Sequence, residues 1–188
     1  MLDPKSQILA ALYQQQPAEA QRLADAAAAL TIWEAAALGR NTAVEQALAA
    51  DASLVDSWSA DGHVPVGLAA FFGHPSTVRL LLARGADVHA TARNPMQVQP
   101  LHAAVAGRNA EAVAAILEQG ADPDARQQAG YTPLMGAAAA GRDDIADLLL
   151  ARGADPSLGN EDGKSAAAIA HEHGHPALAL RLSPASAG

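Results

Sequence analysis

One repeated unit determines what this 188-residue chain can fold into. Gly-Ala-Asp triplets begin at Gly85, Gly120 and Gly153, so successive triplets lie 35 and 33 residues apart. Each triplet follows a proline by 20 residues, and these prolines are Pro65, Pro100 and Pro133. Because this distance is constant, the two extra residues of the longer period must lie in the loop at residues 88–99. A period of this size is typical of folds in which similar units stack in a row.

The plainest copy of the unit, residues 130–155, predicts two antiparallel helices. Thr132 and Pro133 suit a helix start, because the hydroxyl accepts a free main-chain N–H and proline loses no bond there. The first helix is expected over residues 134–140, and Gly141 ends it, since glycine takes the left-handed conformation at little steric cost. The second helix carries an apolar stripe of Ile145, Leu148 and Leu149. Helices this short cannot bury an apolar face alone, so the unit needs neighbours.

Period and local motifs together indicate a family. The motifs Pro100-Leu101-His102, Thr132-Pro133-Leu134 and Gly73-His74, with the three triplets, resemble those of ankyrin-repeat proteins over roughly residues 31–182. The resemblance implies an all-α fold, a solenoid of stacked helix pairs with short hairpin fingers. It also implies that the fingers and the first helices form a concave face. In this family that face generally binds other proteins and has no catalytic chemistry of its own.

The resemblance divides the chain into two caps and a row of repeats. Residues 1–30 predict a divergent N-terminal helix pair, with helices over 6–15 and 18–30. Its polar outer face would consist of Gln14, Gln15, Gln16, Glu19, Gln21, Arg22 and Asp25. The units that follow are expected at 31–58, 59–92, 93–126, 127–159 and, as a C-terminal cap, 160–182, with a tail at 183–188.

The repeat at 93–126 departs from the pattern in two places. Its helix-ending glycine stands one position early, at Gly107, which leaves Arg108 at the usual glycine position. We therefore expect that turn to be strained or shifted by one residue. Gln97 replaces the usual glycine of the finger, and the two-residue insertion falls in the same segment. The finger at 88–99 should thus be longer than its neighbours and differently shaped.

Composition limits the class of function. Hydrophobic residues make up 50% of the chain but aromatic residues only 3%, so the core must form by close approach of small side chains. The absence of cysteine excludes disulfides and thiolate metal sites. A net charge of −8 argues against nucleic acid, which requires a basic face, and against anionic membranes. With neither a leader sequence nor a long apolar run, we expect a cytoplasmic monomer without a cofactor.

Two adjacent phenylalanines are the leading candidates for partner binding. Phe71 and Phe72 end the first helix of their repeat, at positions that the resemblance places facing the concave groove. Large rigid apolar side chains anchor protein interfaces. The alternative is that one of them packs beneath the neighbouring long finger, because adjacent helical residues point about 100° apart.

The other candidates are expected on the fingers. Trp58, His63 and Tyr131 fall at or near finger tips, and Arg93 and Met96 lie on the long finger. Arg93 could pair with an acidic or planar group of a partner. The alternatives are that Trp58 closes the irregular loop after its repeat, since tryptophan usually buries most of its surface, and that Arg93 is a solvated charge.

Catalytic and metal sites are weakly indicated. His171, His173 and His175 form an H-E-H-G-H motif, and imidazole is a common metal ligand. A spacing of two places the first two histidines on opposite faces of a helix. His175, like His74, matches the family's Gly-His position, and the resemblance implies a structural role there. Ser76 with His74 lacks the strand–turn–helix elbow of a nucleophile. We therefore expect neither a metal site nor an active site.

These observations favour a non-enzymatic interaction module: a scaffold, adaptor or inhibitor that binds a partner protein through the concave face. Two other functions stay open. One is a small-molecule or metal-binding domain that uses the groove or the histidine cluster. The other is a structural subunit that assembles with itself through its alanine-rich outer helices.

Overall fold

The computed structural model describes residues 6–183, and the regular secondary structure in this range is helical. The N-terminal pair is α1 (Gln7–Tyr13) and α2 (Pro17–Ala26). The pairs that follow are α3 (Ile32–Ala37) with α4 (Asn41–Ala50), α5 (Pro65–Phe71) with α6 (Pro75–Ala83), α7 (Pro100–Ala106) with α8 (Ala110–Glu118), α9 (Pro133–Ala139) with α10 (Asp143–Ala151), and α11 (Ala166–Glu172) with α12 (Pro176–Leu182). Two 3₁₀ turns, η1 (Ala52–Asp56) and η2 (Gln128–Gly130), lie in connections. Within residues 6–183 no helix has both the length and the apolar character needed to cross a bilayer.

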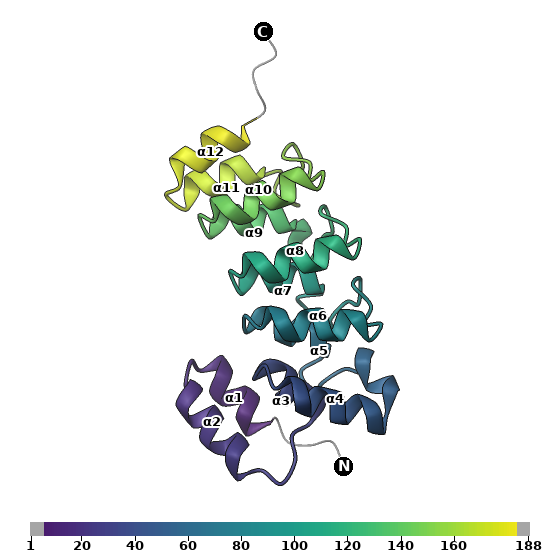
Figure 1. Cartoon of the computed structure of the whole chain (residues 1–188). Coiled ribbons are helices and arrows are strands. Elements are labelled where there is room, and N and C mark those ends of the chain that lie inside the picture. Colours follow the sequence, from purple (N-terminus) through teal and green to yellow (C-terminus); the bar gives the residue numbers. More distant parts are fainter. Residues whose placement is uncertain (1–5, 184–188) are drawn as a thin grey trace.

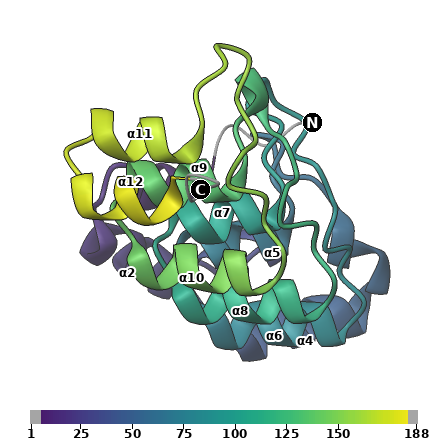
Figure 2. The same ribbon diagram turned by 90° about the horizontal axis from the view of Figure 1, so that it is seen from above.

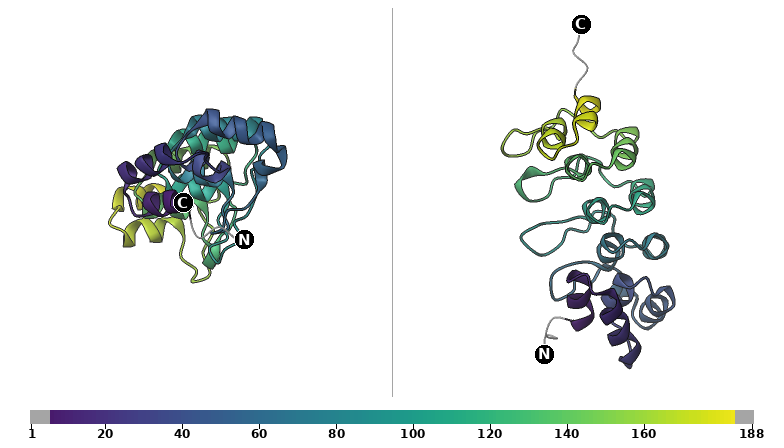
Figure 3. Two further views of the ribbon diagram at one scale, coloured as in Figure 1. Left: turned by 90° about the horizontal axis from the view of Figure 1, so that it is seen from below. Right: turned by 90° about the vertical axis from the view of Figure 1, so that its left-hand side faces the viewer.

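The pairs from α3–α4 to α11–α12 stack in chain order (Figure 1). The first helices α5, α7 and α9 form an inner layer, and α4, α6, α8 and α10 form an outer layer (Figure 2). The connections between pairs project to one side as fingers (Figure 3). The predicted all-α solenoid of helix pairs with hairpin fingers is therefore confirmed.

Small side chains fill the space between inner helices. Residues 65–70 of α5 and 100–105 of α7 are all buried, because each of these helices has a neighbour above and below it. In α10, Ile145 and Leu149 are fully buried, whereas Leu148 is half-buried at the edge of the same cluster. Only two residues of the predicted stripe are thus completely enclosed.

The inner helices begin with unequal caps. The Thr31 hydroxyl accepts from the main-chain N–H of Glu34, and the Glu34 carboxylate accepts in return from the N–H of Thr31. Thr132 caps α9 through a similar reciprocal pair with Met135, whereas the Ser165 hydroxyl only accepts from the main-chain N–H of Ala168. At the equivalent position before α7, the side chain of Gln99 makes no capping bond. In the same helix, one ring nitrogen of the buried His102 has no hydrogen-bond partner within residues 6–183, as described below.

The long finger differs from the others as predicted. Three fingers are closed by a main-chain hydrogen bond between residues four apart, from Ser59, Gln127 and Asn160 to His63, Tyr131 and Lys164. In the long finger the equivalent bond runs from Ala92 to Val98, a distance of 2.9 Å, so the two extra residues lie at its tip. There Gln97 adopts the left-handed conformation (φ 52°) that glycine would supply.

The turn after α7 keeps the repeat's register, which resolves the expectation of a shifted turn. Gly107 is helical (φ −70°) and forms the end of α7, while Arg108 takes the left-handed conformation (φ 56°) of the usual glycine. Gly107 is therefore not a displaced helix terminator. A Cβ at this position would overlap the main-chain oxygens of Ala70, at 2.6 Å, and of Phe71. The glycine lets α7 approach the end of α5.

The N-terminal pair packs on the inner layer of the first repeats. Leu9 of α1 is buried against Ala37 of α3 and Leu68 of α5. α2 ends at Ala26, not at residue 30 as the sequence suggested, and residues 27–31 form a non-helical link to α3. Figure 1 shows α1 and α2 beside α3 rather than as a further layer beneath it. The predicted polar residues of this pair are mostly exposed, while its apolar face covers part of the concave side.

Candidate functional site

A groove of about 420 Å³ lies where the inner helices meet the fingers. Residues of α5, α7 and α9 form its floor, and the fingers contribute His63, Met96, Val98 and Gln127 to one wall. The floor consists largely of small residues, namely Gly67, Ala103, Ala106, Gly136 and Ala140. Such a floor allows the main chain of a ligand to approach closely. The groove is thus apolar, elongated across three repeats, and located on the concave face.

An aromatic cluster closes the end of the groove next to the N-terminal pair. Phe71 is 40% exposed and lines the groove, with its ring centroid 6.1 Å from that of Tyr13 and 5.1 Å from that of Phe72. Tyr13, at the end of α1, also lines the groove and is 42% exposed. Its hydroxyl donates to an oxygen of Asp61 at 3.0 Å. Burial and the Asp61 carboxylate raise the pKa of Tyr13, so this tyrosine remains a neutral donor.

The two phenylalanines lie in different surroundings. Phe72 is half-buried and packs against the cluster of Leu9, Ala37 and Leu68 beneath the N-terminal pair. It does not line the groove. Phe71 is therefore the member of the pair available to a partner, while Phe72 helps to fix the N-terminal pair in place. The expectation that adjacent helical residues rarely share one environment is met, although the cover is α1 and not the long finger.

His63 and Met96 extend the apolar wall along the fingers. Met96 is 49% exposed at the tip of the long finger, and its main-chain oxygen accepts from Gln128 of the next finger at 3.1 Å. His63 is half-buried, and its Nε2 accepts from the amide of Asn94 at 3.2 Å. Adjacent fingers are therefore tied together at their tips, so this wall forms a continuous surface.

Besides Phe72, three sequence-predicted residues stand apart from the groove. The guanidinium of Arg93 lies 3.4 Å from the centroid of the Trp58 ring, in a cation–π contact between neighbouring fingers. The indole N–H of Trp58 donates to the oxygen of Thr91 at 3.3 Å. Tyr131 is half-buried against the main core. The structure thus brings Phe71, Met96 and His63 together, and it places Trp58, Arg93, Tyr131 and Phe72 in supporting positions around them.

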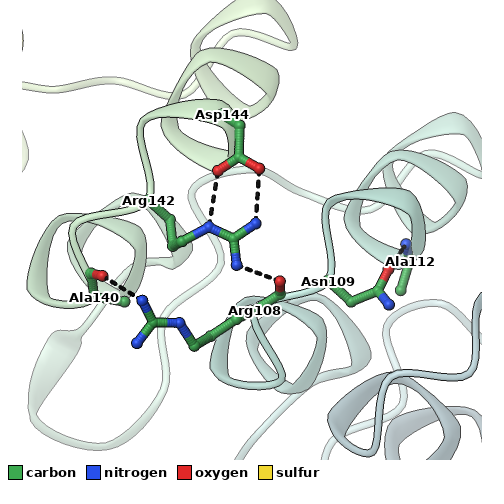
Figure 4. A network of polar contacts seen from close by, with 6 residues as sticks. All are labelled: Arg108, Asn109, Ala112, Ala140, Arg142 and Asp144. Carbon is green, nitrogen blue, oxygen red and sulfur yellow. Dashed lines mark hydrogen bonds and ion pairs between the residues drawn. The ribbon is translucent and has the colours of Figure 1, made fainter.

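Two groove residues were not anticipated from the sequence. Tyr13 belongs to the N-terminal pair, whose position on the concave side has no signature in the repeat. Arg108 occupies a glycine position, and the sequence indicated only an irregular turn there. Its guanidinium donates to the oxygen of Ala140 at 3.0 Å, and its own main-chain oxygen accepts from Arg142 (Figure 4). Arg142 in turn holds Asp144 by two hydrogen bonds, at 2.9 and 2.7 Å.

His102 lies under the groove floor and is 5% exposed. Its Nε2 donates to the oxygen of Ala125 at 3.1 Å, since a carbonyl can only accept. Nδ1 is buried and has no hydrogen-bond partner within residues 6–183. Burial lowers the pKa of His102, and nearby main-chain oxygens offset this only in part. The histidine is therefore a neutral structural residue that bonds the finger to the helix.

The histidines of the H-E-H-G-H motif have separate surroundings. His173 Nδ1 contacts the oxygen of Ile169 at 2.9 Å, and His171 is exposed. The ring of His175 lies on Gly141, as that of His74 lies on Gly39. No group of three or more histidine, aspartate or glutamate side chains suited to a metal ion occurs in the part of the chain that the structure describes.

Comparison with known proteins supports the interpretation of the repeats. A family model described as ankyrin repeats in three copies matches residues 32–127 and 101–186. A search of curated proteins finds no match. The two matched segments overlap and together span every repeat that lines the groove.

Proposed function

This chain belongs to the ankyrin-repeat family, whose members are generally protein–protein interaction modules, and we propose that it is a non-enzymatic scaffold, adaptor or inhibitor that binds a partner protein through its concave groove. The observation that carries the proposal is the half-exposed apolar surface of Phe71, Met96 and Tyr13 around a floor of small residues. Exposed aromatic and methionine side chains are typical anchors of interfaces.

The surroundings of Phe71 support its role as an anchor. Its ring is held at the groove by contacts with Tyr13 and Phe72 on one side. A side chain fixed before binding loses little conformational entropy in the complex. Partner residues that cover Phe71 and Met96 would also be enclosed between the inner helices and the fingers. The groove therefore offers a preformed site, and the partner is a protein of unknown identity.

Affinity purification followed by quantitative mass spectrometry tests this function. We expect Phe71→Ala to reduce recovery of the partner strongly, because it removes the ring at the centre of the aromatic cluster. Leu180→Ala is a matched control, since Leu180 is 78% exposed on α12, away from the groove. Equal recovery with both variants, at an unchanged unfolding temperature, would refute concave-face binding.

A further inference from the structure

Arginines on the two sides of the solenoid differ in their partners. On the outer layer, arginines pair with acids of the neighbouring repeat: Arg79 with Glu111 at 3.6 Å, Arg84 with Glu45 at 2.9 Å, and Arg181 with Asp143 at 3.0 Å. On the groove and finger side, Arg93, Arg108 and Arg126 contact an aromatic ring or main-chain oxygens. None of these three forms an ion pair within residues 6–183.

Arg108 is the only residue with a formal charge among the described residues that line the groove, with histidine taken as neutral. The backbone of Arg108 is fixed by the hydrogen bond from Arg142, and one guanidinium N–H is used by Ala140. The remaining N–H donors of the guanidinium are available to a ligand. The residue is exposed at the end of α7, beside the small residues of the floor.

Two acidic side chains close to groove residues, Asp61 and Asp144, are already engaged in hydrogen bonds. Asp61 accepts hydrogen bonds from Tyr13 at 3.0 Å and from Ser59 at 2.5 Å. Asp144 is held by both guanidinium bonds from Arg142. The hydrogen bonds from Arg142 lower the pKa of Asp144, which therefore stays ionised. Although the chain carries a net charge of −8, the groove itself presents a cation within an apolar surface.

We propose that the groove binds a segment of the partner protein that carries an acidic side chain close to a large apolar side chain. The apolar side chain lies against Phe71, Tyr13 and Met96, and the carboxylate pairs with Arg108. This inference deepens the proposed function and rests on it. It assigns to the partner a chemistry opposite to the one that the net charge of the chain suggests, since a strongly acidic protein would be expected to attract basic partners.

The position of Arg108 favours an acidic side chain over a terminal carboxylate. Arg108 follows α7, which lies between α5 and α9 in the stack (Figure 1). Residues of both neighbouring helices line the groove, so it continues past Arg108 on both sides. A segment that fills the groove therefore passes Arg108 in its middle. Pairing of a guanidinium with a carboxylate can be bidentate, which gives geometric selectivity as well as attraction.

Selection from a random peptide library displayed on phage, with the full chain as bait, tests the proposal. We expect enriched peptides to share an aspartate or glutamate near a large apolar residue. With one enriched peptide made synthetically, Arg108→Gln should raise Kd about tenfold, an effect that shrinks as salt increases. Exchange of the peptide's acid for its amide should weaken binding to the wild-type chain by a similar factor. The matched control Arg79→Gln, on the outer layer, should leave Kd unchanged.

A double-mutant cycle separates this inference from the proposed function. If the pairing is direct, the amide peptide loses little further affinity in the Arg108→Gln chain. Two results would overturn the acidic partner and leave groove binding intact. One is that the enriched peptides contain no acid. The other is a Kd that Phe71→Ala raises but that neither Arg108→Gln nor the amide peptide changes. Failure to enrich any peptide whose binding depends on Phe71 would overturn both. The amide peptide needs no protein variant, so a folding defect in Arg108→Gln cannot obscure the result.

Discussion

Gly107 and Arg108 illustrate how adjacent residues divide two structural requirements. One position needs a residue without a side chain, because the oxygens of Ala70 and Phe71 lie where a Cβ would be. The next position needs a left-handed backbone, which Arg108 adopts in place of glycine. In the other repeats a single glycine after the inner helix satisfies the second requirement alone, as at Gly73 and Gly141.

We predict that Gly107→Ala destabilises the fold by about 1–3 kcal/mol, because the added methyl group forces α7 away from α5. Gly67→Ala is the matched control, since a Cβ there would lie 3.5 Å from Val64 Cγ2, an ordinary contact. Because alanine has a higher helix propensity than glycine, Gly67→Ala should leave the free energy of unfolding unchanged or raise it. Urea unfolding of both variants measures the difference. Equal stability of the two variants would show that the close approach of α7 to α5 is not a constraint.

A second prediction at this scale concerns the unpartnered Nδ1 of His102. Residues 99 and 102 correspond to Thr132 and Met135 of the next repeat, where the threonine hydroxyl accepts from the main-chain N–H three residues on. Gln99→Thr should place a hydroxyl where it caps α7 and donates to Nδ1. We expect a gain of about 1 kcal/mol in the free energy of unfolding. The gain should shrink in a His102→Gln background, and an equal gain in both backgrounds would mean that capping alone is responsible.

The buried histidines also predict how stability depends on pH. Burial lowers the pKa of His74 and of His102 below their ordinary value of 6.5. As pH falls from 6.5 towards the folded-state values, the unfolded chain takes up protons that the folded chain does not, so stability decreases. Urea unfolding at pH 7 and pH 5 should therefore show lower stability at pH 5, with a smaller drop in His102→Gln. An unchanged drop in that variant would contradict this role of His102.

At the scale of elements, the amphipathic pattern predicts helices better than it ranks the residues within them. Ile145, Leu148 and Leu149 share one stripe of α10, but only Ile145 and Leu149 are fully buried. The neighbouring helix pairs cover only part of this apolar stripe. Burial within it depends on the position of those neighbours, which the local sequence of α10 does not specify.

We predict that Leu149→Ala costs about 2–5 kcal/mol and Leu148→Ala clearly less, because the first leaves an enclosed cavity and the second a partly open surface. Both changes remove the same atoms from the same helix, so each variant controls for the helix propensity of the other. Thermal and urea unfolding give the two values. A larger effect for Leu148 would indicate that α10 is rotated relative to its neighbours.

At the scale of the whole molecule, the sequence was sufficient to predict the fold. The repeat period, the prolines at the helix starts and the Gly-Ala-Asp triplets each indicate the same repeat independently. The groove could be predicted only in part. Phe71, Met96 and His63 follow from their repeat positions, whereas Tyr13 depends on how the N-terminal pair packs across the inner helices. That contact joins residues far apart in the chain. No periodic pattern reports it.

The same limit explains the candidates that lie outside the groove. Trp58 is predicted at or near a finger tip and Arg93 on the long finger, but their side chains contact each other across two neighbouring fingers. Phe72 follows Phe71 directly, yet the N-terminal pair covers it. In each case the repeat pattern predicted the helix or finger that carries the residue. The direction of its side chain depends on a neighbouring segment that the repeat pattern does not describe.

The central claim is that a partner protein binds in the groove between the inner helices and the fingers. Hydrogen exchange measured by mass spectrometry, with and without the purified partner, tests it most directly. We expect slower exchange of main-chain amides in the finger tips around His63 and Met96 and at the turn of Arg108. Outer helices α4, α6, α8 and α10 should be unchanged. Protection confined to those outer helices, with the finger tips unaffected, would contradict the claim.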